Sequence, residues 1–160
     1  MKKNIIIMSV VIVAVALIIG GYFFIFSGEG IEDYTGVTVI IDDHTIDTGS
    51  QKTIDVDVLN AVDLVAGEIW IQYDPTYLTY TDSDAGGNGY TSHDSSSHIV
   101  KLMPIFTTGG KTGTVSIGTI TFTRVTSGIT TLTFSKSNCY LRDSVDTNIP
   151  IETWVTGDMI

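Results

Sequence analysis

The chain has 160 residues, which is enough for one domain and little more. Its 18 carboxylates outnumber its 8 lysines and arginines, so the formal net charge is −10. A surface this acidic repels the phosphate backbone of nucleic acids, and we therefore exclude nucleic-acid binding. The single cysteine, Cys139, excludes an intramolecular disulfide framework. With no basic cluster near it in the sequence, we interpret it as a small buried apolar residue in a strand.

The N-terminal part of the chain is its most apolar segment. A basic stub, residues 1–4, carries Lys2 and Lys3, and residues 5–26 contain no charged side chain. A helix over residues 5–26 is long enough to cross a hydrocarbon core of about 30 Å, so we expect a transmembrane helix. The two lysines favour a cytoplasmic N-terminus, which places the remainder outside the cell. A cleaved signal peptide is the alternative, although its apolar core is usually shorter and ends at a small-x-small site.

Residues 27–35 form a short polar linker, and residues 36–160 have the pattern of one β domain. No segment beyond the linker carries the i, i+3, i+4 apolar stripe of a helix. Short β-branched and alternating runs are separated instead by turns rich in Gly, Asp, Asn and Ser. The expected strands are 37–41, 53–59, 64–73, 78–80, a short edge strand near 89–92, 98–106, 115–122, 129–134, 139–141 and 151–155. About nine strands at this spacing, not counting the short edge strand, predict an all-β sandwich.

The stretch from residue 64 to 78 reads LVAGEIWIQYDPTYL and is the most informative of these strands. Strict alternation puts three large apolar side chains on its buried face. The opposite face receives a carboxylate, an indole and an amide, from Glu68, Trp70 and Gln72. Tryptophan is enriched at interface hot spots, so this outward face is a candidate binding surface.

Two other positions predict local irregularity in the sheets. The apolar residues around Ile117 and Ile120 share a face only if one residue is inserted between them, and Gly118 is the expected site of that β-bulge. Pro104 has no N–H for a ladder, so the strand over residues 98–106 is expected at an edge or with a bulge.

Two patterns resemble metal sites. Residues 82–84 begin like a calcium loop, but Gly86 stands where an oxygen ligand is needed and His93 stands where a bidentate Glu would close the loop. His93, Asp94 and His98 supply too few convergent ligands for zinc. We therefore expect no metal and no cofactor.

Catalytic arrangements are equally weak. No segment resembles a nucleophile elbow or a catalytic-cysteine setting. Asp55 and Asp57 point to the same side of one strand, which fits a solvated face better than a glycosidase cleft. We expect a protein that is not an enzyme.

The order of these segments resembles the cohesin domain over residues 36–160. The segments that carry the resemblance are VDVLNAVDL, AGEIWIQYDPTYL and GTITFTRVTSGITTLTFSKSN. The Tyr73-Asp74-Pro75 corner followed by Leu78 is the most specific piece. The resemblance implies a nine-stranded antiparallel β-sandwich with jelly-roll topology. It also implies a non-catalytic role, namely docking the calcium-binding dockerin module of another protein.

The resemblance also implies where docking takes place. In cohesins the strand before the corner contributes outward residues to the dockerin-facing sheet, and the residue five before the tyrosine is commonly acidic, as Glu68 is here. Ala66 stands where many members place an asparagine, a departure that bears on the type of dockerin recognised. Glu68, Trp70 and Gln72 are the expected partner-binding residues.

The sequence therefore predicts a single-pass cell-membrane protein with an extracellular cohesin-like domain. Its expected partner is a dockerin-type or other cell-surface protein. Carbohydrate-binding modules share the architecture, so polysaccharide binding through Trp70 is an alternative. A pilin-like filament subunit has a similar layout and is a second alternative, although the short basic leader ending in glycine that such subunits carry is missing.

Overall fold

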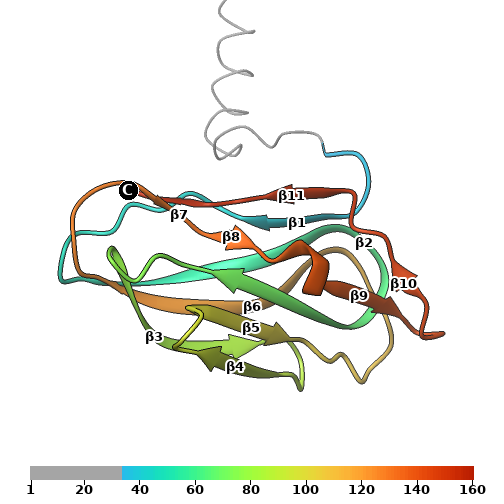
Figure 1. Cartoon of the computed structure of the whole chain (residues 1–160). Helices are drawn as coiled ribbons and strands as arrows, with labels where there is room; N and C mark the ends of the chain where they lie inside the picture. The colour runs from blue at the N-terminus through green and yellow to red at the C-terminus, as the bar shows by residue number, and fades with distance from the viewer. Residues whose placement is uncertain (1–33) are drawn as a thin grey trace, which may run out of the picture. The chain divides into compact units, whose positions relative to one another are not determined.

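The computed structural model describes residues 34–160, and the chain divides into two units after Asp33. The predicted all-β class is confirmed for these residues, which carry twelve strands and one short 3-10 helix, η1 (Lys136–Asn138) (Figure 1). The expected basic stub, membrane helix and most of the linker lie outside the described residues. Between residues 34 and 160, no helix has the length and apolar character needed to span a bilayer. The strands are β1 (Thr38–Ile41), β2 (Gln51–Gln72), β3 (Leu78–Ala85), β4 (Tyr90–Asp94), β5 (Ile99–Met103), β6 (Lys111–Arg124), β7 (Thr130–Thr131), β8 (Thr133–Phe134), β9 (Tyr140–Asp143), β10 (Asn148–Ile149), β11 (Thr153–Val155) and β12 (Asp158–Met159).

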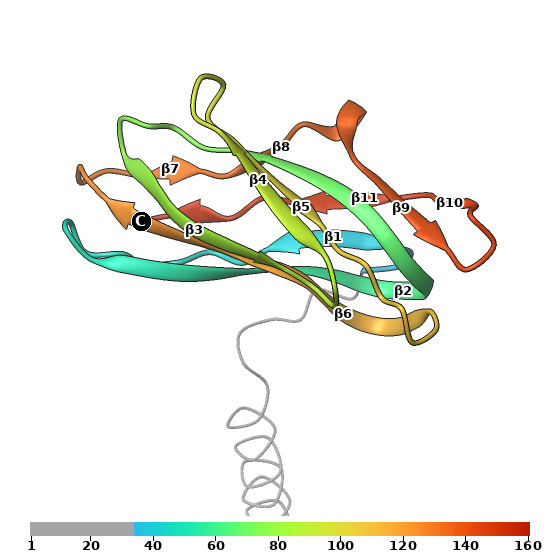
Figure 2. The same cartoon turned by 90° about the horizontal axis from the view of Figure 1, so that it is seen from below.

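The strands lie in two layers that share β2 (Figures 1 and 2). In the first layer the order is β3–β6–β2–β1–β11. In the second layer the order is β4–β5–β2–β9–β10, and the short strand β8 also pairs with β2. Apolar side chains from both layers form one buried cluster, so the domain is a β-sandwich with a single core.

Strand β2 is continuous for 22 residues and takes part in both layers. We expected two separate strands, 53–59 and 64–73, and this expectation was wrong. Asn60 and Asp63 adopt left-handed backbone angles, each with φ of 55°, and the register with β6 shifts on either side of Ala61. Asn and Asp tolerate this conformation better than most residues, so the strand bends between the layers without ending.

Pairing between β1 and β11, strands near the two ends of the domain, departs from the antiparallel prediction. β1 and β11 are parallel, with Val39 opposite Trp154. Period-2 alternation does not encode the direction of a partner that is more than a hundred residues away, so this pair could not be predicted from it.

The predicted total of nine strands is also too low for the described residues, which contain twelve. Pro150 has no N–H for a ladder and separates β10 from β11. The expected strand over residues 129–134 is divided at Leu132, because β7 pairs with β12 whereas β8 pairs with β2 in the second layer.

The predicted alternation of buried residues is confirmed. Ile54, Val56 and Val58 are fully buried in the first half of β2, and Ile69 and Ile71 are fully buried in its second half. Val115 and Ile117 precede the irregularity in β6, Ile120 and Phe122 follow it, and all four are buried. These side chains fill the space between the two layers. Because side chains alternate between the faces of a strand, the residues between them face solvent.

The β-bulge expected at Gly118 is confirmed. Val56 lies opposite Gly118 and Asp57 lies opposite Ser116, so Ile117 is the additional residue on β6. Gly118 has φ of 153°. The bulge keeps the apolar residues on both sides of it directed into the core.

Two smaller expectations need correction. The strand over residues 98–106 is β5, which ends at Met103 and lies between β2 and β4, so it is not an edge strand. Pro104 directly follows the strand: its carbonyl accepts from the Gly67 N–H at 3.2 Å, but it has no N–H to return the bond, which interrupts the ladder there. Cys139 does not lie in a strand either, because it follows η1 and precedes β9, and it is only partly buried.

Candidate binding surface

The outer face of the second layer consists of rows of side chains set by the pairing of β4, β5, β2 and β9. Trp70 lies opposite Lys101 on β5, which in turn lies opposite Ser92 on β4. A neighbouring row contains Gln72, Ile99 and Asp94. In further rows Met103 lies opposite Tyr90, and Glu68 lies opposite Tyr140. Side chains directly opposite one another on one face have Cβ atoms about 5 Å apart, so these rows form a continuous surface. We call this surface the docking face.

Glu68, Trp70 and Gln72 all lie on the docking face, as alternation predicts. Gln72 is exposed, and Glu68 and Trp70 are partly exposed. Their role in binding stays a prediction.

Trp70 is held by contacts of both its side chain and its backbone. Its indole N–H donates a hydrogen bond to Oε1 of Glu68 at 2.7 Å, and its backbone N–H donates to Sγ of Cys139 at 3.2 Å. The Lys101 ammonium lies 3.7 Å from the centroid of the indole ring. A cation above an indole ring is attracted to its negative face, so the ring is fixed beside a positive charge.

A second aromatic–cation pair lies on the β9 side of the docking face. The Arg142 guanidinium carbon is 5.3 Å from the ring centroid of Tyr140, and Arg142 also forms an ion pair with Asp146 at 2.5 Å. Tyr140 is 38% exposed, and Tyr90 at the far edge of the face is 61% exposed. Large aromatic groups that stay this exposed at both edges are typical of interaction surfaces.

The docking face is close to neutral on an acidic domain. Residues 34–160 contain 6 lysines and arginines against 15 carboxylates. On the docking face, Lys101 and Arg142 accompany Glu68, Asp94 and the Asp146 that pairs with Arg142, which leaves a single net negative charge. Hydroxyls and backbone N–H groups of Ser96 and Ser97 donate to the Asp94 carboxylate and hold its pKa well below its usual range. The negative charge of the domain therefore lies mainly elsewhere.

The Tyr73-Asp74-Pro75 corner forms a local turn at one end of the docking face. The Asp74 side chain accepts a hydrogen bond from the backbone N–H of Thr76 at 2.8 Å. The backbone carbonyl of Asp74 accepts from the N–H groups of Tyr77 and Leu78. Asp74 therefore holds the turn between β2 and β3, an Asx-type role, and Pro75 fixes the chain direction.

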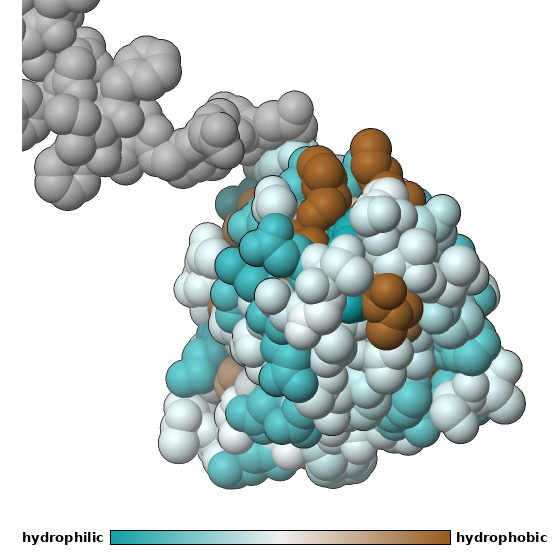
Figure 3. Space-filling model, turned by 90° about the vertical axis from the view of Figure 1, so that its left-hand side faces the viewer, coloured by the Kyte–Doolittle hydropathy of each residue, from teal (hydrophilic) through white to brown (hydrophobic). Residues whose placement is uncertain are grey.

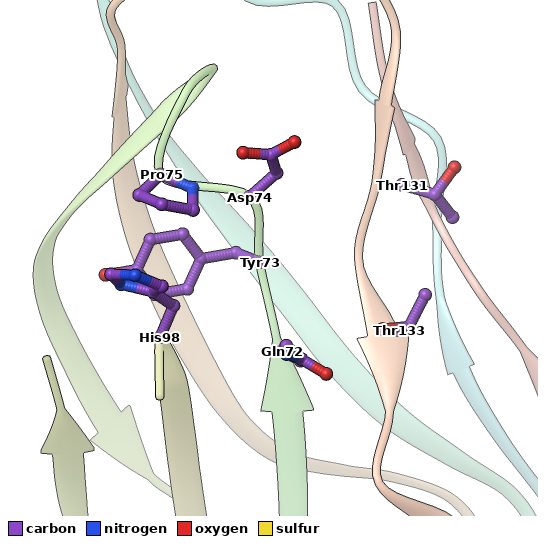
Figure 4. A pocket seen from close by; sticks show the side chains of 7 residues that line it. All are labelled: Gln72, Tyr73, Asp74, Pro75, His98, Thr131 and Thr133. Carbon is purple, nitrogen blue, oxygen red and sulfur yellow. The ribbon is translucent and has the colours of Figure 1, made fainter. Parts of the chain in front are cut away.

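A shallow depression of about 310 Å³ lies beside this corner (Figure 4). The rings of Tyr73 and His98 lie together on one side of it, and Thr131 and Thr133 line the opposite side. The residues that line it are Gln72, Tyr73, Asp74, Pro75, His98, Thr131 and Thr133. Its carboxylate is engaged in the turn, so the depression supplies polar contacts at the rim of the docking face rather than a separate reactive site.

The end of the domain where the C-terminus lies presents a mostly polar surface in which apolar residues form small separate patches (Figure 3). Val125, Ile129 and Ile160 are exposed apolar residues of segments that meet near this end. Isolated apolar residues of this kind are normal on soluble surfaces, so the docking face is the stronger candidate for a binding surface.

The groups considered for metal binding or catalysis have structural contacts. No cluster of three or more His, Cys, Asp or Glu side chains suited to a metal ion is found among residues 34–160. Asp82 and Asp84 belong to β3 and pair with β6, so they do not form a calcium loop. His93 shares a hydrogen bond of 2.9 Å with the Tyr73 hydroxyl. Burial raises the pKa of the Cys139 thiol, which disfavours the reactive thiolate.

Sequence reasoning missed part of the docking face, including Tyr90, Lys101, Met103, Tyr140 and Arg142. The alternation of HIVKLM, residues 98–103, could have placed Lys101 and Met103 outward, opposite the buried Val100 and Leu102. The alignment of Lys101 with Trp70 depends on the register between β2 and β5, which no local pattern supplies.

Comparisons with known proteins give the same fold. No family model matches the sequence, and no curated protein matches it. Solved structures match with TM-scores well above those of unrelated folds. A cohesin of OlpA in complex with a dockerin, from Clostridium thermocellum, is 15% identical with a TM-score of 0.68, covering 78% of this chain and 98% of that chain. The sixth cohesin of scaffoldin B from Acetivibrio cellulolyticus, in complex with the Cel5 dockerin, is 19% identical with the same TM-score and the same coverage.

A third structure comes from outside the cellulosome. The non-cellulosomal cohesin of the archaeon Archaeoglobus fulgidus is 18% identical with a TM-score of 0.65, covering 79% of this chain and 92% of that chain. At this level of identity the similarity establishes the architecture and leaves the partner open. The described domain of this chain has the cohesin fold.

Proposed function

We propose that this chain is a non-catalytic, membrane-anchored module that docks a partner protein of the dockerin type at the cell surface. The observation that carries the proposal is the docking face, a nearly neutral surface with aromatic and aliphatic side chains on an otherwise acidic domain of the cohesin fold. Solved cohesins of similar fold are in complex with dockerins, which supports the same kind of partner here.

The composition of the docking face supports protein recognition. Trp70, Tyr90 and Tyr140 supply large rigid side chains, which are enriched at interface hot spots. Ile99 and Met103 supply apolar surface between them, and Met adapts well to a partner of irregular shape. The charged residues lie singly among these groups and can set the orientation of the partner.

A non-catalytic role is supported by the contacts of the nucleophilic and basic groups. His93 is hydrogen-bonded to Tyr73, and the Cys139 thiol lies between the backbone of Trp70 and the carbonyl oxygen of Ser135, which it approaches to 3.3 Å. Both groups contribute to packing and hydrogen bonding, so neither is poised to react.

The membrane anchor is supported by the sequence of residues 5–26 and by the lysines that precede it. An anchored docking module would keep its partner at the outer surface of the cell. Alkaline extraction of membranes, which releases peripheral proteins, tests this part: we expect the chain to stay in the membrane fraction, and its full release would contradict the anchor.

Carbohydrate binding has less support. A sugar ring that stacks on tryptophan needs a free face of the indole, and the Lys101 ammonium is 3.7 Å from the centroid of that ring. A glycan array with the full chain and Trp70→Phe tests this alternative. A signal that disappears in the variant would favour a sugar ligand over a protein partner.

The docking role is tested by pull-down of calcium-loaded dockerin-bearing proteins of the source organism with the full chain. We expect capture that is lost in EDTA, because dockerins fold around calcium. Tyr90→Ala and Lys101→Glu should each weaken capture at least about tenfold, the effect of losing one hot-spot contact. If no dockerin-bearing protein is captured in calcium, the docking role is wrong.

A matched control separates loss of the surface from loss of the fold. Thr114→Ala changes an exposed residue of β6 in the first layer, away from the docking face. It should leave capture unchanged, and all variants should keep the circular dichroism spectrum of the unmodified chain. Equal weakening by Thr114→Ala would show that the docking face is not the binding surface.

A further inference from the structure

The docking face continues around one edge of the sandwich into a cleft of about 260 Å³. Here the chain passes from β10 in the second layer to β11 in the first layer (Figure 1). Both strands are short, and Pro150 between them cannot extend a ladder, so the edges of the two layers separate. The lining residues are Lys136, Cys139, Tyr140, Asn148, Ile149, Ile151 and Trp154.

The lining of this cleft combines apolar with polar side chains and is only partly buried. Ile149, Ile151 and Trp154 pack against the core but keep part of their surface exposed. The Trp154 ring lies 5.0 Å from the ring of Phe134, centroid to centroid, which fixes it at the back of the cleft. Apolar surface left open in this way gains free energy when a partner covers it, at about 25 cal/mol per Å².

The charge at the cleft is positive on an acidic domain. Lys136 is the only charged residue among those that line it, and its ammonium is 6.0 Å from the centroid of Trp154. Arg142 lies opposite Asn148 in the β9–β10 pair, but its charge is engaged in the ion pair with Asp146, so Lys136 is the cation left for a partner. The closest carboxylate in sequence, Glu152, is turned towards Gly36 and does not line the cleft.

Tyr140 connects the cleft to the docking face. It lies opposite Glu68 on the docking face and also lines the cleft. Cys139, the next lining residue, accepts the hydrogen bond from the backbone of Trp70. A partner that covers Trp70 and Tyr140 would therefore reach the mouth of the cleft without leaving the surface.

We propose that this cleft is a second anchoring point of the docking surface, which receives an apolar side chain flanked by carboxylates on the partner protein. The proposal rests on the docking function proposed above and adds the chemistry of the partner. The apolar side chain packs on Ile149, Ile151 and Trp154, and a flanking carboxylate faces Lys136. Charge complementarity of this kind favours acidic partner segments over basic ones.

The test uses short blocked peptides and the fluorescence of Trp154. The chain contains two tryptophans, so the Trp70→Phe variant leaves Trp154 as the reporter. The full chain with this change is titrated with acetyl-Glu-Leu-Glu-amide, acetyl-Lys-Leu-Lys-amide and acetyl-Glu-Gly-Glu-amide. We expect a saturable change in emission with Glu-Leu-Glu and binding at least about tenfold weaker with the other two, because each lacks one of the complementary features.

Charge-reversal variants supply the control. Lys136→Glu should reverse the preference between the Glu-Leu-Glu and Lys-Leu-Lys peptides. Lys52→Glu makes the same charge change on an exposed residue at the start of β2 in the first layer, and it should leave the preference unchanged. An unchanged emission with Glu-Leu-Glu, or the same affinity for all three peptides, overturns the proposal.

The outcome is separable from the test of docking. Capture of a dockerin-bearing protein without any response of Trp154 to the peptides overturns the cleft and leaves the docking function standing. A response of Trp154 without capture supports the cleft and counts against the dockerin as the partner.

Discussion

The imidazole ring of His93 stacks on the ring of Tyr80, with centroids 4.0 Å apart and planes inclined by 20°. His93 comes from β4 in the second layer and Tyr80 from β3 in the first, so the stack joins the two layers along one side of the sandwich. Tyr73 hydrogen-bonds the same imidazole and its ring lies 5.9 Å away. The protonation state of His93 therefore bears on the stability of the domain.

We predict that His93 makes stability depend on pH. Burial lowers the pKa of His93, the nearby charge of Asp94 opposes this shift, and His98 adds to it. The folded state thus binds the proton less readily than the unfolded state, whose histidine titrates near pH 6.5. The stability that His93 contributes is complete above about pH 6.5 and is lost as the pH falls through its folded-state pKa.

The measurement is urea denaturation of the full chain and of His93→Gln between pH 7.5 and 5. At pH 7.5 the variant should be less stable by about 1 kcal/mol, because it loses the ring stack. This difference should shrink as the pH falls. Tyr80→Phe, which keeps the ring stack and removes only the hydroxyl hydrogen-bonded to Ser83, is the control and should show a constant difference. A gap for His93→Gln that widens at low pH would contradict the assignment.

We predict that the ionised Asp57 carboxylate lowers the free energy of unfolding of the domain at neutral pH. Burial raises its pKa, a hydrogen bond with Ser116 lowers it, and the charges of Asp55 and Asp42 raise it further. A raised pKa means that the folded state favours the protonated form, so the stability present at acid pH is lost as the pH rises through the folded-state pKa. Asp57→Asn should raise Tm at pH 7 by about 2 °C, a small effect because the group is only half-buried.

The control for Asp57 is Asp55→Asn on the same strand face, which removes an exposed charge. It should raise Tm less than Asp57→Asn does. Differential scanning calorimetry at pH 7 and pH 3.5 checks both, and the advantage of Asp57→Asn should disappear at the lower pH. A gain of equal size at both values would refute the electrostatic explanation.

Gly118 should tolerate no side chain. Its φ of 153° is rare for other residues, and a Cβ there would meet the backbone carbonyl of Asp84. Gly118→Ala should cost about 3 kcal/mol in the free energy of unfolding, from backbone strain and steric overlap together. Gly113, with φ of 93° and open space around it, separates the two causes. Gly113→Ala should cost about 1 kcal/mol from strain alone, and equal costs at the two sites would argue against the overlap.

Lys101 and Trp70 should be coupled energetically. A double-mutant cycle of Lys101→Met and Trp70→Phe, followed by circular dichroism in urea, should give a coupling of about 0.5–1 kcal/mol. Lys111 lies farther from the ring of Phe106, at 5.9 Å, and the cycle of Lys111→Met and Phe106→Leu should give a smaller value. A coupling of zero for the first pair would mean that the ring is not held by the cation.

Much of the core could be predicted because its signal is local. Alternation with period 2 indicates which side of a strand faces the core. It correctly predicted that Ile69 and Ile71 are buried and that Trp70 faces outward. The bulge at Gly118 was also local, since it restores the phase of a pattern interrupted within one strand.

The relations between distant segments could not be predicted in the same way. The two expected strands are continuous in β2 because Asn60 and Asp63 adopt left-handed backbone angles. Polar residues at these positions are equally compatible with a turn that ends a strand, so local sequence did not predict a continuous one. The docking face depends on register, since Lys101 meets Trp70 only through the pairing of β2 with β5. Local patterns therefore identified one strand of the docking face, and the other strands could be identified only from the strand pairing in the structure.

The passage of β2 through both layers has a consequence for how the domain folds. Neither layer is complete until this strand has bent at Asn60 and Asp63 and found partners on both sides, so the layers cannot form one after the other as separate units. Most of its pairings join segments far apart in the chain, which predicts slow and cooperative folding. Amide hydrogens of Val56 and Ile71, at opposite ends of β2, should accordingly exchange with the same free energy of opening, that of global unfolding.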